Sequence, residues 1–156
     1  MENDIPHSGI RIDKDGVWYY NGNEIFRDEI VRYFYRNLKR DEAGRYLIEL
    51  EHDSCYLEVE DAPFVVKAVY RCTGRTDNEE CIILLLSDQS IEELNPDSLW
   101  AGKDNVLYCS VKENVFVARF SRASYYQIAE FIEYGDDEGE YFISLNGKHF
   151  LITTVS

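Results

Sequence analysis

The sequence has few cysteines and no closely spaced pair of them. Cys55, Cys72, Cys81 and Cys109 are irregularly spread, and no C-x-x-C unit occurs. This spacing excludes a zinc ribbon and a thioredoxin-like motif. Each cysteine lies in or beside an apolar, strand-like segment, where a free thiol behaves as a small hydrophobic group. We therefore expect reduced, buried thiols, and the sequence gives no positive support for a redox switch.

Long apolar segments and basic residues are also scarce. The longest apolar run, Cys81 to Leu86, is far too short to cross a bilayer, and no basic and apolar signal segment opens the chain. Acidic residues outnumber basic ones by 30 to 16, which gives a formal net charge of −14. Such a surface repels a phosphate backbone. These features predict a cytoplasmic protein that binds neither a membrane nor nucleic acid.

Signatures of catalysis are missing as well. The sequence has no G-x-x-x-x-G-K-[ST], G-x-G-x-x-G, H-E-x-x-H or G-x-S-x-G motif, and no pair of nucleophile and base can be assembled from its motifs. His52 stands between Glu51 and Asp53, but neighbours on a strand point to opposite faces, which disfavours a metal site. We expect a protein that is not an enzyme and that holds no cofactor or metal.

What the chain does contain is apolar surface and an internal repeat. Hydrophobic residues make up 45% of the 156 residues and aromatic residues 14%. At this size that is enough to bury about two-thirds of the unfolded surface, and the aromatic share favours strands. The segment Ile25 to Val59, shifted by 95 positions, aligns with Phe120 to Thr154 without a gap. Both segments contain, in the same order, an arginine, a helical pattern, an Asp-x-x-Gly-x-Tyr turn and a hairpin pattern.

The periodicity predicts a hairpin, a helix and a second hairpin in each half. In the first half Phe26, Ile30, Phe34 and Leu38 form a core-facing helical stripe that Asp41 to Gly44 terminates. The other expected elements are strands at 10–13, 17–20, 45–51, 54–60, 64–70, 80–86, 106–112, 115–120, 141–145 and 148–155, and a helix at 122–134. This pattern predicts an α+β fold of two repeats with antiparallel sheets, each packed on one helix, over domains 1–62 and 63–156 that share an interface.

Four charged residues suggest a ligand site between the halves. Arg27 and Arg122 occupy equivalent positions at the predicted helix starts, where backbone N–H groups and the helix dipole favour an anion. An arginine adds a planar fork that suits carboxylate or phosphate. Glu60 and Asp61 precede Pro63 at the predicted boundary. The alternative interpretation is structural: the acids neutralise the arginines and fix how the halves dock.

Aromatic residues would complete such a site. Trp18, Tyr46 and Phe64 would supply an apolar or stacking surface near the boundary, and Tyr125 would join them from the second helix. With the charged residues they make a candidate site in which the arginines hold an anionic group and the aromatic residues offer an apolar surface.

Three motifs carry a family resemblance: Asp15-Gly16-x-Trp18-x-Tyr20-x-Gly22-x-x-Ile25-x-Arg27, Val59-Glu60-Asp61-x-Pro63-Phe64 and Ser121-Arg122-x-x-Tyr125-Tyr126. Together they resemble a bacterial family known as domain of unknown function 1285, over most of the chain. The resemblance implies a duplicated α+β fold whose C-terminal half is superficially similar to pleckstrin-homology domains. It also implies a pocket between the halves, suited to a nucleotide-like ligand, and a role in signalling.

We therefore expect a non-enzymatic ligand-binding or signalling module that holds a nucleotide-like or anionic small molecule between its halves. The alternative is an interaction or scaffold domain that binds a protein partner or a second copy of itself. Exposed strand edges and abundant tyrosine suit that second function.

Overall fold

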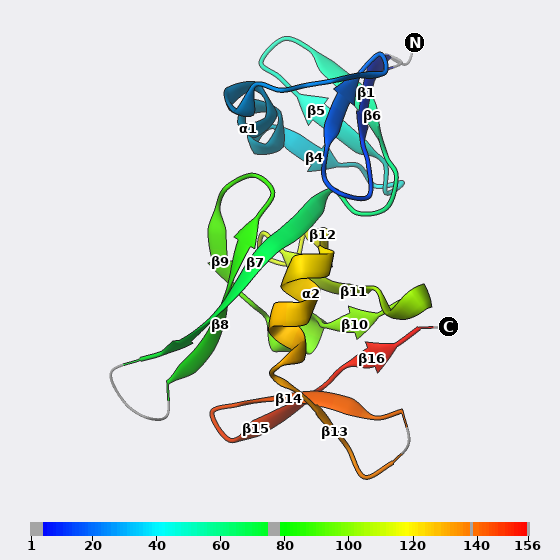
Figure 1. Cartoon of the computed structure of the whole chain (residues 1–156). Helices are drawn as coiled ribbons and strands as arrows, with labels where there is room; N and C mark the ends of the chain where they lie inside the picture. The colour runs from blue at the N-terminus through cyan, green and yellow to red at the C-terminus, as the bar shows by residue number, and fades with distance from the viewer. Residues whose placement is uncertain (1–4, 75–78, 138, 156) are drawn as a thin grey trace. The chain divides into compact units, whose positions relative to one another are not determined.

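The computed structural model describes residues 5–74, 79–137 and 139–155, and the chain divides into two compact units, Met1–Pro63 (unit 1) and Phe64–Ser156 (unit 2). The fold is α+β, as expected, and two α-helices occur in the described part of the chain (Figure 1). Both the unit 1 sheet and the larger unit 2 sheet contain parallel pairs, so the prediction of antiparallel sheets is wrong for these pairs. α1 has nine residues and α2 has eight, and no helix among the described residues is long and apolar enough to cross a membrane.

Unit 1 consists of one mixed sheet and one helix. Its elements are β1 (His7–Ile12), β2 (Trp18–Tyr20), β3 (Asn23–Glu24), α1 (Asp28–Arg36), β4 (Leu38–Arg40), β5 (Tyr46–Glu49) and β6 (Ser54–Val59). The strand order is β3-β2-β1-β6-β5-β4. β1 pairs antiparallel with β2 and parallel with β6, so it joins the first hairpin to the strands that follow the helix.

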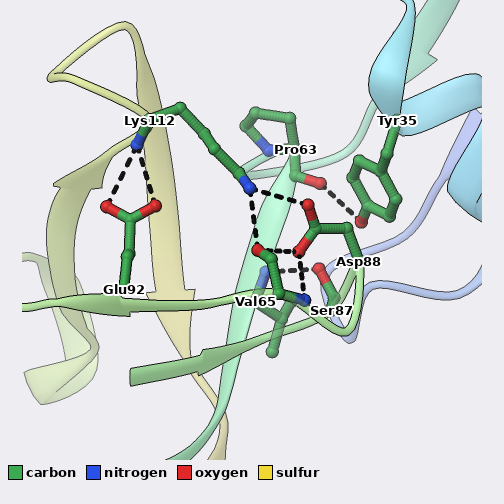
Figure 2. A network of polar contacts seen from close by, with 8 residues as sticks. Tyr35, Pro63, Val65, Ser87, Asp88, Glu92 and Lys112 are labelled. Carbon is green, nitrogen blue, oxygen red and sulfur yellow. Dashed lines mark hydrogen bonds and ion pairs between the residues drawn. The ribbon is translucent and has the colours of Figure 1, made fainter. Parts of the chain in front are cut away.

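An aromatic cluster holds α1 in unit 1. Trp18 is 1% exposed, and its ring is stacked with that of Phe34 at a centroid distance of 5.9 Å. The Tyr35 ring meets Trp18 edge-on at 4.8 Å, and its hydroxyl donates a hydrogen bond of 2.9 Å to the Pro63 carbonyl (Figure 2). Buried aromatic pairs of this kind contribute through both burial and ring geometry. The helix is therefore fixed chiefly by aromatic packing.

The first helix is shorter than the sequence pattern predicts. The helix gives way at Asn37, whose N–H donates to the Phe34 carbonyl, and Leu38 then lies in β4 opposite Ile48. Phe26 precedes the helix and is 80% exposed, so its predicted place in the core is wrong. Pairing with β5 gives residues 38–40 backbone hydrogen bonds along one side of the strand, and these replace the hydrogen bonds of a longer helix.

Unit 2 contains two sheets and the second helix. Its elements are β7 (Phe64–Thr73), β8 (Glu80–Leu86), β9 (Ile91–Glu93), the 3-10 helix η1 (Pro96–Ser98), β10 (Trp100–Ala101), the 3-10 helix η2 (Lys103–Asn105), β11 (Leu107–Val111), β12 (Phe116–Phe120), α2 (Arg122–Ala129), β13 (Ile132–Tyr134), β14 (Tyr141–Leu145), β15 (Lys148–Leu151) and β16 (Thr153–Thr154). One sheet has the order β16-β10-β11-β12-β7-β8-β9, and the other has the order β13-β14-β15.

α2 is attached to β7, the longest strand of unit 2 (Figure 1). Ser124 is fully buried, and its hydroxyl donates a 2.8 Å hydrogen bond to the Val66 carbonyl. The register between β7 and β8 shifts after Val66, and the Val69 N–H donates to the Gln127 side-chain oxygen at 2.7 Å. These polar contacts place one face of the helix directly over the strand, where Ile128 is completely buried.

The second helix is also shorter than expected. It ends at Ala129, the Phe131 N–H bonds back to the Ile128 carbonyl, and Ile132 begins β13 opposite Ile143 of β14. The predicted extension of this helix to Tyr134 is therefore wrong. Residues 132–134 instead form a strand that pairs antiparallel with β14, with Glu133 opposite Phe142 and Tyr134 opposite Tyr141.

A polar network connects two turns of the larger sheet of unit 2 (Figure 2). The Lys112 ammonium lies 2.8 Å from Asp88 Oδ2 and donates to Ser90 Oγ at 2.7 Å. The Lys112 N–H bonds to both oxygens of Glu92 at 3.2 Å. Burial alone would raise the pKa of Asp88, but hydrogen bonds from Lys112 and Ser90 lower it. The network thereby ties the turn after β8 to the β11–β12 turn.

Candidate functional site

A groove runs beside α2 in unit 2 and is called here the α2 groove. It consists of two adjoining pockets of about 360 and 350 Å³ that share Asn105, Leu107 and Tyr125. The first pocket is also lined by Asp104, Val106, Arg119, Phe120, Ser121, Arg122 and Tyr126. The second is also lined by Ala101, Ala129, Ile132, Tyr134, Tyr141, Ile152 and Thr154. Volumes of this size suit a small organic ligand.

Three neighbouring strands supply a row of lining residues. Ala101 of β10 lies opposite Leu107 of β11 on one side and opposite Thr154 of β16 on the other. Residues that are paired across a sheet project to the same face. The row therefore forms one continuous strip of small and apolar side chains that contributes to the second pocket.

Two tyrosines form an aromatic wall of the second pocket. Tyr134 of β13 is directly opposite Tyr141 of β14, and the ring centroids are 5.2 Å apart. Tyr134 is 79% exposed, whereas Tyr141 is half-buried. A wall with one exposed aromatic face offers a stacking surface to a planar ligand group.

The N-terminus of α2 brings basic groups to the first pocket. The Ser121 hydroxyl caps the helix by accepting the Ser124 N–H at 3.1 Å. Arg122 is the first helical residue and is exposed, and no ion pair to it occurs within the described ranges. Arg119 lines the same pocket from β12. Cationic side chains beside a capped helix start favour an anionic group.

A tight loop between β10 and β11 forms another wall. Asp104 and Asn105 have φ values of 58° and 60°, in the left-handed region that non-glycine residues rarely adopt. The loop follows Gly102, whose substitution by any other residue would place a Cβ 3.1 Å from the Tyr108 ring and 3.3 Å from Trp100. These two rings are stacked at 4.2 Å. Glycine thus lets the backbone pass over the ring pair and hold the strained loop at the groove.

Two of the eight residues predicted for the ligand site line the α2 groove, namely Arg122 and Tyr125. Arg27 is the exposed N-cap residue of α1, one step earlier in its helix than Arg122. Glu60 accepts a 2.7 Å hydrogen bond from the Lys14 N–H, and Asp61 is exposed.

The other predicted aromatic residues lie in core or partly covered positions. Trp18 and Phe64 are each 1% exposed, and Phe64 packs on Phe116 at a centroid distance of 5.4 Å. Tyr46 is half-buried in β5, with the Arg40 guanidinium 5.9 Å from its ring centroid. Desolvation raises the pKa of Tyr46, although nearby Arg40 opposes the shift. These side chains serve mainly the packing of their own units.

Several groove residues were missed by the sequence patterns. The contribution of Tyr134 was hidden by its assignment to the second helix, and Ala101 and Thr154 lie too far apart in the sequence for any local pattern to unite them. The alternation of Ile132 and Tyr134 was the available signal for a strand that would face Tyr141. Within the described residues, no group of three or more His, Cys, Asp or Glu side chains is placed to hold a metal ion.

Comparisons with known proteins agree with the resemblance seen in the motifs. Residues 3–62 match the sequence profile described as domain of unknown function (DUF1285), N-terminal domain. No curated protein has a similar sequence. The crystal structure of a DUF1285 family protein from Silicibacter pomeroyi DSS-3 has a TM-score of 0.77 and 24% identity, over 97% of this chain and 85% of that one.

A second solved structure has the same kind of fold. It is a DUF1285 family protein from Shewanella baltica OS155, with a TM-score of 0.64 and 18% identity, over 79% of this chain and 91% of that one. The predicted resemblance is confirmed: residues 3–62 match the N-terminal domain of the DUF1285 family, and the chain shares the fold of two bacterial DUF1285 family proteins.

Proposed function

We propose that this protein is a non-enzymatic ligand-binding module and that its α2 groove takes a small anionic molecule with a planar ring, such as a nucleotide. The observation that carries this proposal is the position of Arg122. Its side chain lies at the basic end of a groove of adequate size, at the first residue of a helix, and it has no ion-pair partner among the described residues.

The net negative charge of the protein means that an anion can bind only where local positive charges overcome it. A net charge of −14 opposes the approach of any anion from solution. Binding therefore depends on Arg122 and Arg119 acting at short range, where an arginine can form two charge-assisted hydrogen bonds to one phosphate or carboxylate. Asp104 in the same pocket would reject a second anionic group placed near it.

The aromatic wall accounts for the ring in the proposed ligand. Tyr134 and Tyr141 stand at the second pocket, and Tyr125 lines both pockets. An elongated ligand can thus place its anionic end at Arg122 and its ring at the tyrosines. A protein that uses such a groove to sense a metabolite would act in signalling, which the sequence resemblance also implies.

The test is thermal unfolding of the whole chain with a panel of nucleoside monophosphates, cyclic nucleotides and the matching uncharged nucleosides. A ligand at 100 times its dissociation constant adds about 2.7 kcal/mol to the free energy of unfolding. Arg122→Ala should weaken binding by about 10-fold to 100-fold, because a charge-assisted hydrogen bond contributes about 1.5–3 kcal/mol.

The matched control is Lys148→Ala, which removes one exposed positive charge from β15 outside the lining of the groove. It should leave the binding unchanged. Equal weakening by both variants would indicate a general charge effect and contradict the assignment to the groove. A flat response to the whole panel, together with mass that grows with concentration in light scattering, would instead favour a homodimeric interaction domain.

We also propose that the two helix-and-hairpin segments, α1 to β6 and α2 to β15, arose by duplication. The support is the shared order of helix, short strand, Asp-x-x-Gly turn and hairpin, with the glycine in each turn at a positive φ of 84° or 82°. The similarity of the C-terminal half to pleckstrin-homology domains stays a prediction of the family resemblance.

A further inference from the structure

We propose that Cys72 and Cys81 are a modification site: an intramolecular disulfide that forms reversibly between β7 and β8. The two residues are directly opposite each other in the antiparallel pairing of these strands. Cys72 is exposed and Cys81 is half-buried. Eight residues separate the two cysteines in the sequence, and they form no C-x-x-C unit. The sequence alone therefore does not reveal this pairing.

The register places the two thiols within reach of each other. Gly74 N–H donates to the Glu79 carbonyl at 2.5 Å, which identifies that pair as hydrogen-bonded. Hydrogen-bonded and non-hydrogen-bonded pairs alternate along an antiparallel ladder, so Cys72 and Cys81, two positions further along each strand, also form a hydrogen-bonded pair. The Cα atoms of such a pair are about 5.5 Å apart, inside the range of about 4.4–6.8 Å found for disulfides.

Both side chains project to the same face of the sheet, because they are opposite each other. The Arg71 and Glu80 side chains, which form an ion pair, belong to the other face, since each is one position away on its strand. Closing the disulfide therefore does not require this ion pair to break. The exposure of Cys72 gives an oxidant direct access to one of the two sulfur atoms.

The other cysteines do not compete for this role. Cys55 belongs to β6 of unit 1, where it lies opposite Ile48. Cys109 is completely buried in β11, and its burial raises the pKa of the thiol, which leaves little reactive thiolate. Cys72 and Cys81 are thus the pair that the structure brings together.

The reaction is thiol–disulfide exchange with a small disulfide, such as oxidised glutathione. The Cys72 thiolate attacks one sulfur of the oxidant, the oxidant's S–S bond breaks, and one thiolate leaves. The Cys81 thiolate then attacks the Cys72 sulfur of the mixed disulfide and releases the second thiolate. The two protons lost by Cys72 and Cys81 end on the two released thiols, and the small disulfide is reduced by two electrons.

The second step starts from a thiol that is weakly ionised but close to its target. Burial raises the pKa of Cys81, and the neighbouring Cys72 and Glu93 raise it further, so less of this thiol is ionised. Cys81 is nevertheless held beside the sulfur that it must attack, and proximity compensates for low ionisation. A mixed disulfide on Cys72 should therefore form first and then disappear.

The experiment treats the reduced full-length protein with oxidised glutathione and follows its intact mass and its free thiols after denaturation. We expect the four thiols to fall to two, a product that lacks two hydrogen atoms, and a Cys72–Cys81 crosslink in the peptide map. Dithiothreitol should restore all four thiols. Cys81→Ser should stop at a glutathione adduct on Cys72, and Cys72→Ser should give no internal crosslink.

Cys55→Ser is the matched control and should form the same crosslink as the natural sequence. A stable glutathione adduct on Cys72 in the natural sequence would overturn the proposal, as would four unreacted thiols or a crosslink that involves another cysteine or a second chain. If Cys81→Ser does not fold, the peptide map of the natural sequence alone decides between these outcomes.

Discussion

The two helix-and-hairpin segments share an order of elements but are stabilised by different chemistry. In unit 1, α1 is followed by β4, β5 and β6, and β6 continues into a six-stranded sheet by pairing with β1. In unit 2, α2 is followed by β13, β14 and β15, which form a separate sheet of three strands. The same local sequence of structures can therefore serve as part of a larger sheet or as a sheet by itself.

The turns of the two segments differ in their side chains. In the first, the Asp41 carboxylate accepts the Ala43 and Arg45 N–H groups at 3.0 and 2.8 Å, the Arg45 Nε at 2.9 Å and the Tyr56 hydroxyl at 3.1 Å. In the described part of the second, no hydrogen bond or ion pair reaches the Asp136 side chain. Both turns have a glycine at positive φ, but among the described residues only the first has hydrogen bonds to its aspartate. The backbone conformation of such a turn therefore does not require the aspartate network.

The largest expected effect tests how the two helices are anchored. Trp18→Ala should lower the free energy of unfolding by about 3–5 kcal/mol, because it removes the ring on which Phe34 and Tyr35 pack. Ile128→Ala, which truncates the completely buried side chain on the inner face of α2, should cost about 2–5 kcal/mol. Denaturant unfolding followed by circular dichroism measures both.

Trp18→Phe is the control for the first of these variants. The indole N–H of Trp18 is buried with no hydrogen-bond partner among the described residues, so replacing the indole by a phenyl ring also removes an unsatisfied donor. We expect a loss well below that of Trp18→Ala. An equal loss would show that α1 does not depend on an aromatic ring at this position.

The next effect concerns the hydrogen bond that Ser124 of α2 donates to β7. Ser124→Ala should cost about 1–3 kcal/mol, because the Val66 carbonyl loses a buried donor at 2.8 Å. Ser121→Ala, which removes the helix cap and a hydrogen bond to the Ser124 hydroxyl but keeps the bond to Val66, should cost about 1 kcal/mol. The same denaturant series applies, and a loss for Ser124→Ala no larger than for Ser121→Ala would contradict a special role for the bond to β7.

A smaller and equal pair of effects is expected at the two turn glycines. Gly44→Ala and Gly139→Ala should each cost about 1–2 kcal/mol, since both positions are in the left-handed region. An added Cβ would approach nothing closer than 3.5 Å at Gly44 and nothing within 4 Å at Gly139. The cost is therefore backbone strain alone. Unequal losses in thermal unfolding would show that the two turns are not energetically alike.

The smallest effect is the pH dependence of the first turn. Desolvation acts to raise the pKa of Asp41, but hydrogen bonds from Arg45 and Tyr56 lower it below the ordinary value of 3.8. Folding is therefore favoured by this group above that value, and the contribution is lost as the pH falls through the lower folded pKa. Asp41→Asn should reduce the loss of thermal stability on acidification, which thermal unfolding at a series of pH values measures. A variant that loses as much stability on acidification as the natural sequence would contradict this prediction.

The sequence was sufficient for the turns and most hairpin strands but not for the ends of the helices. Glycine and aspartate at fixed spacing determine the two turns locally, so they could be predicted. Leu38 and Ile132 were assigned to helices because their spacing fits an apolar helical face. In the structure both are paired with the strand that follows in the chain, at Ile48 and Ile143, and this strand pairing overrides the helical pattern.

The candidate site could be predicted only in part, for a similar reason. Arg122 and Tyr125 were identified because a helix start and a family motif are local features. The row of Ala101, Leu107 and Thr154 depends on a parallel pairing between segments far apart in the chain. No periodicity within a short window contains that information.

The strand orders have a consequence for how the chain folds as it is synthesised. Every strand of the unit 1 sheet lies within residues 7–59, so this sheet can close while later residues are still being made. The larger sheet of unit 2 begins at Phe64 but pairs β10 with β16, whose residues are Thr153 and Thr154. Its edge at β10 stays unpaired until that late segment emerges. During synthesis the unit 1 sheet can therefore complete its pairing before the larger unit 2 sheet does. The unpaired β10 edge of unit 2 is available for wrong pairing during this longer interval.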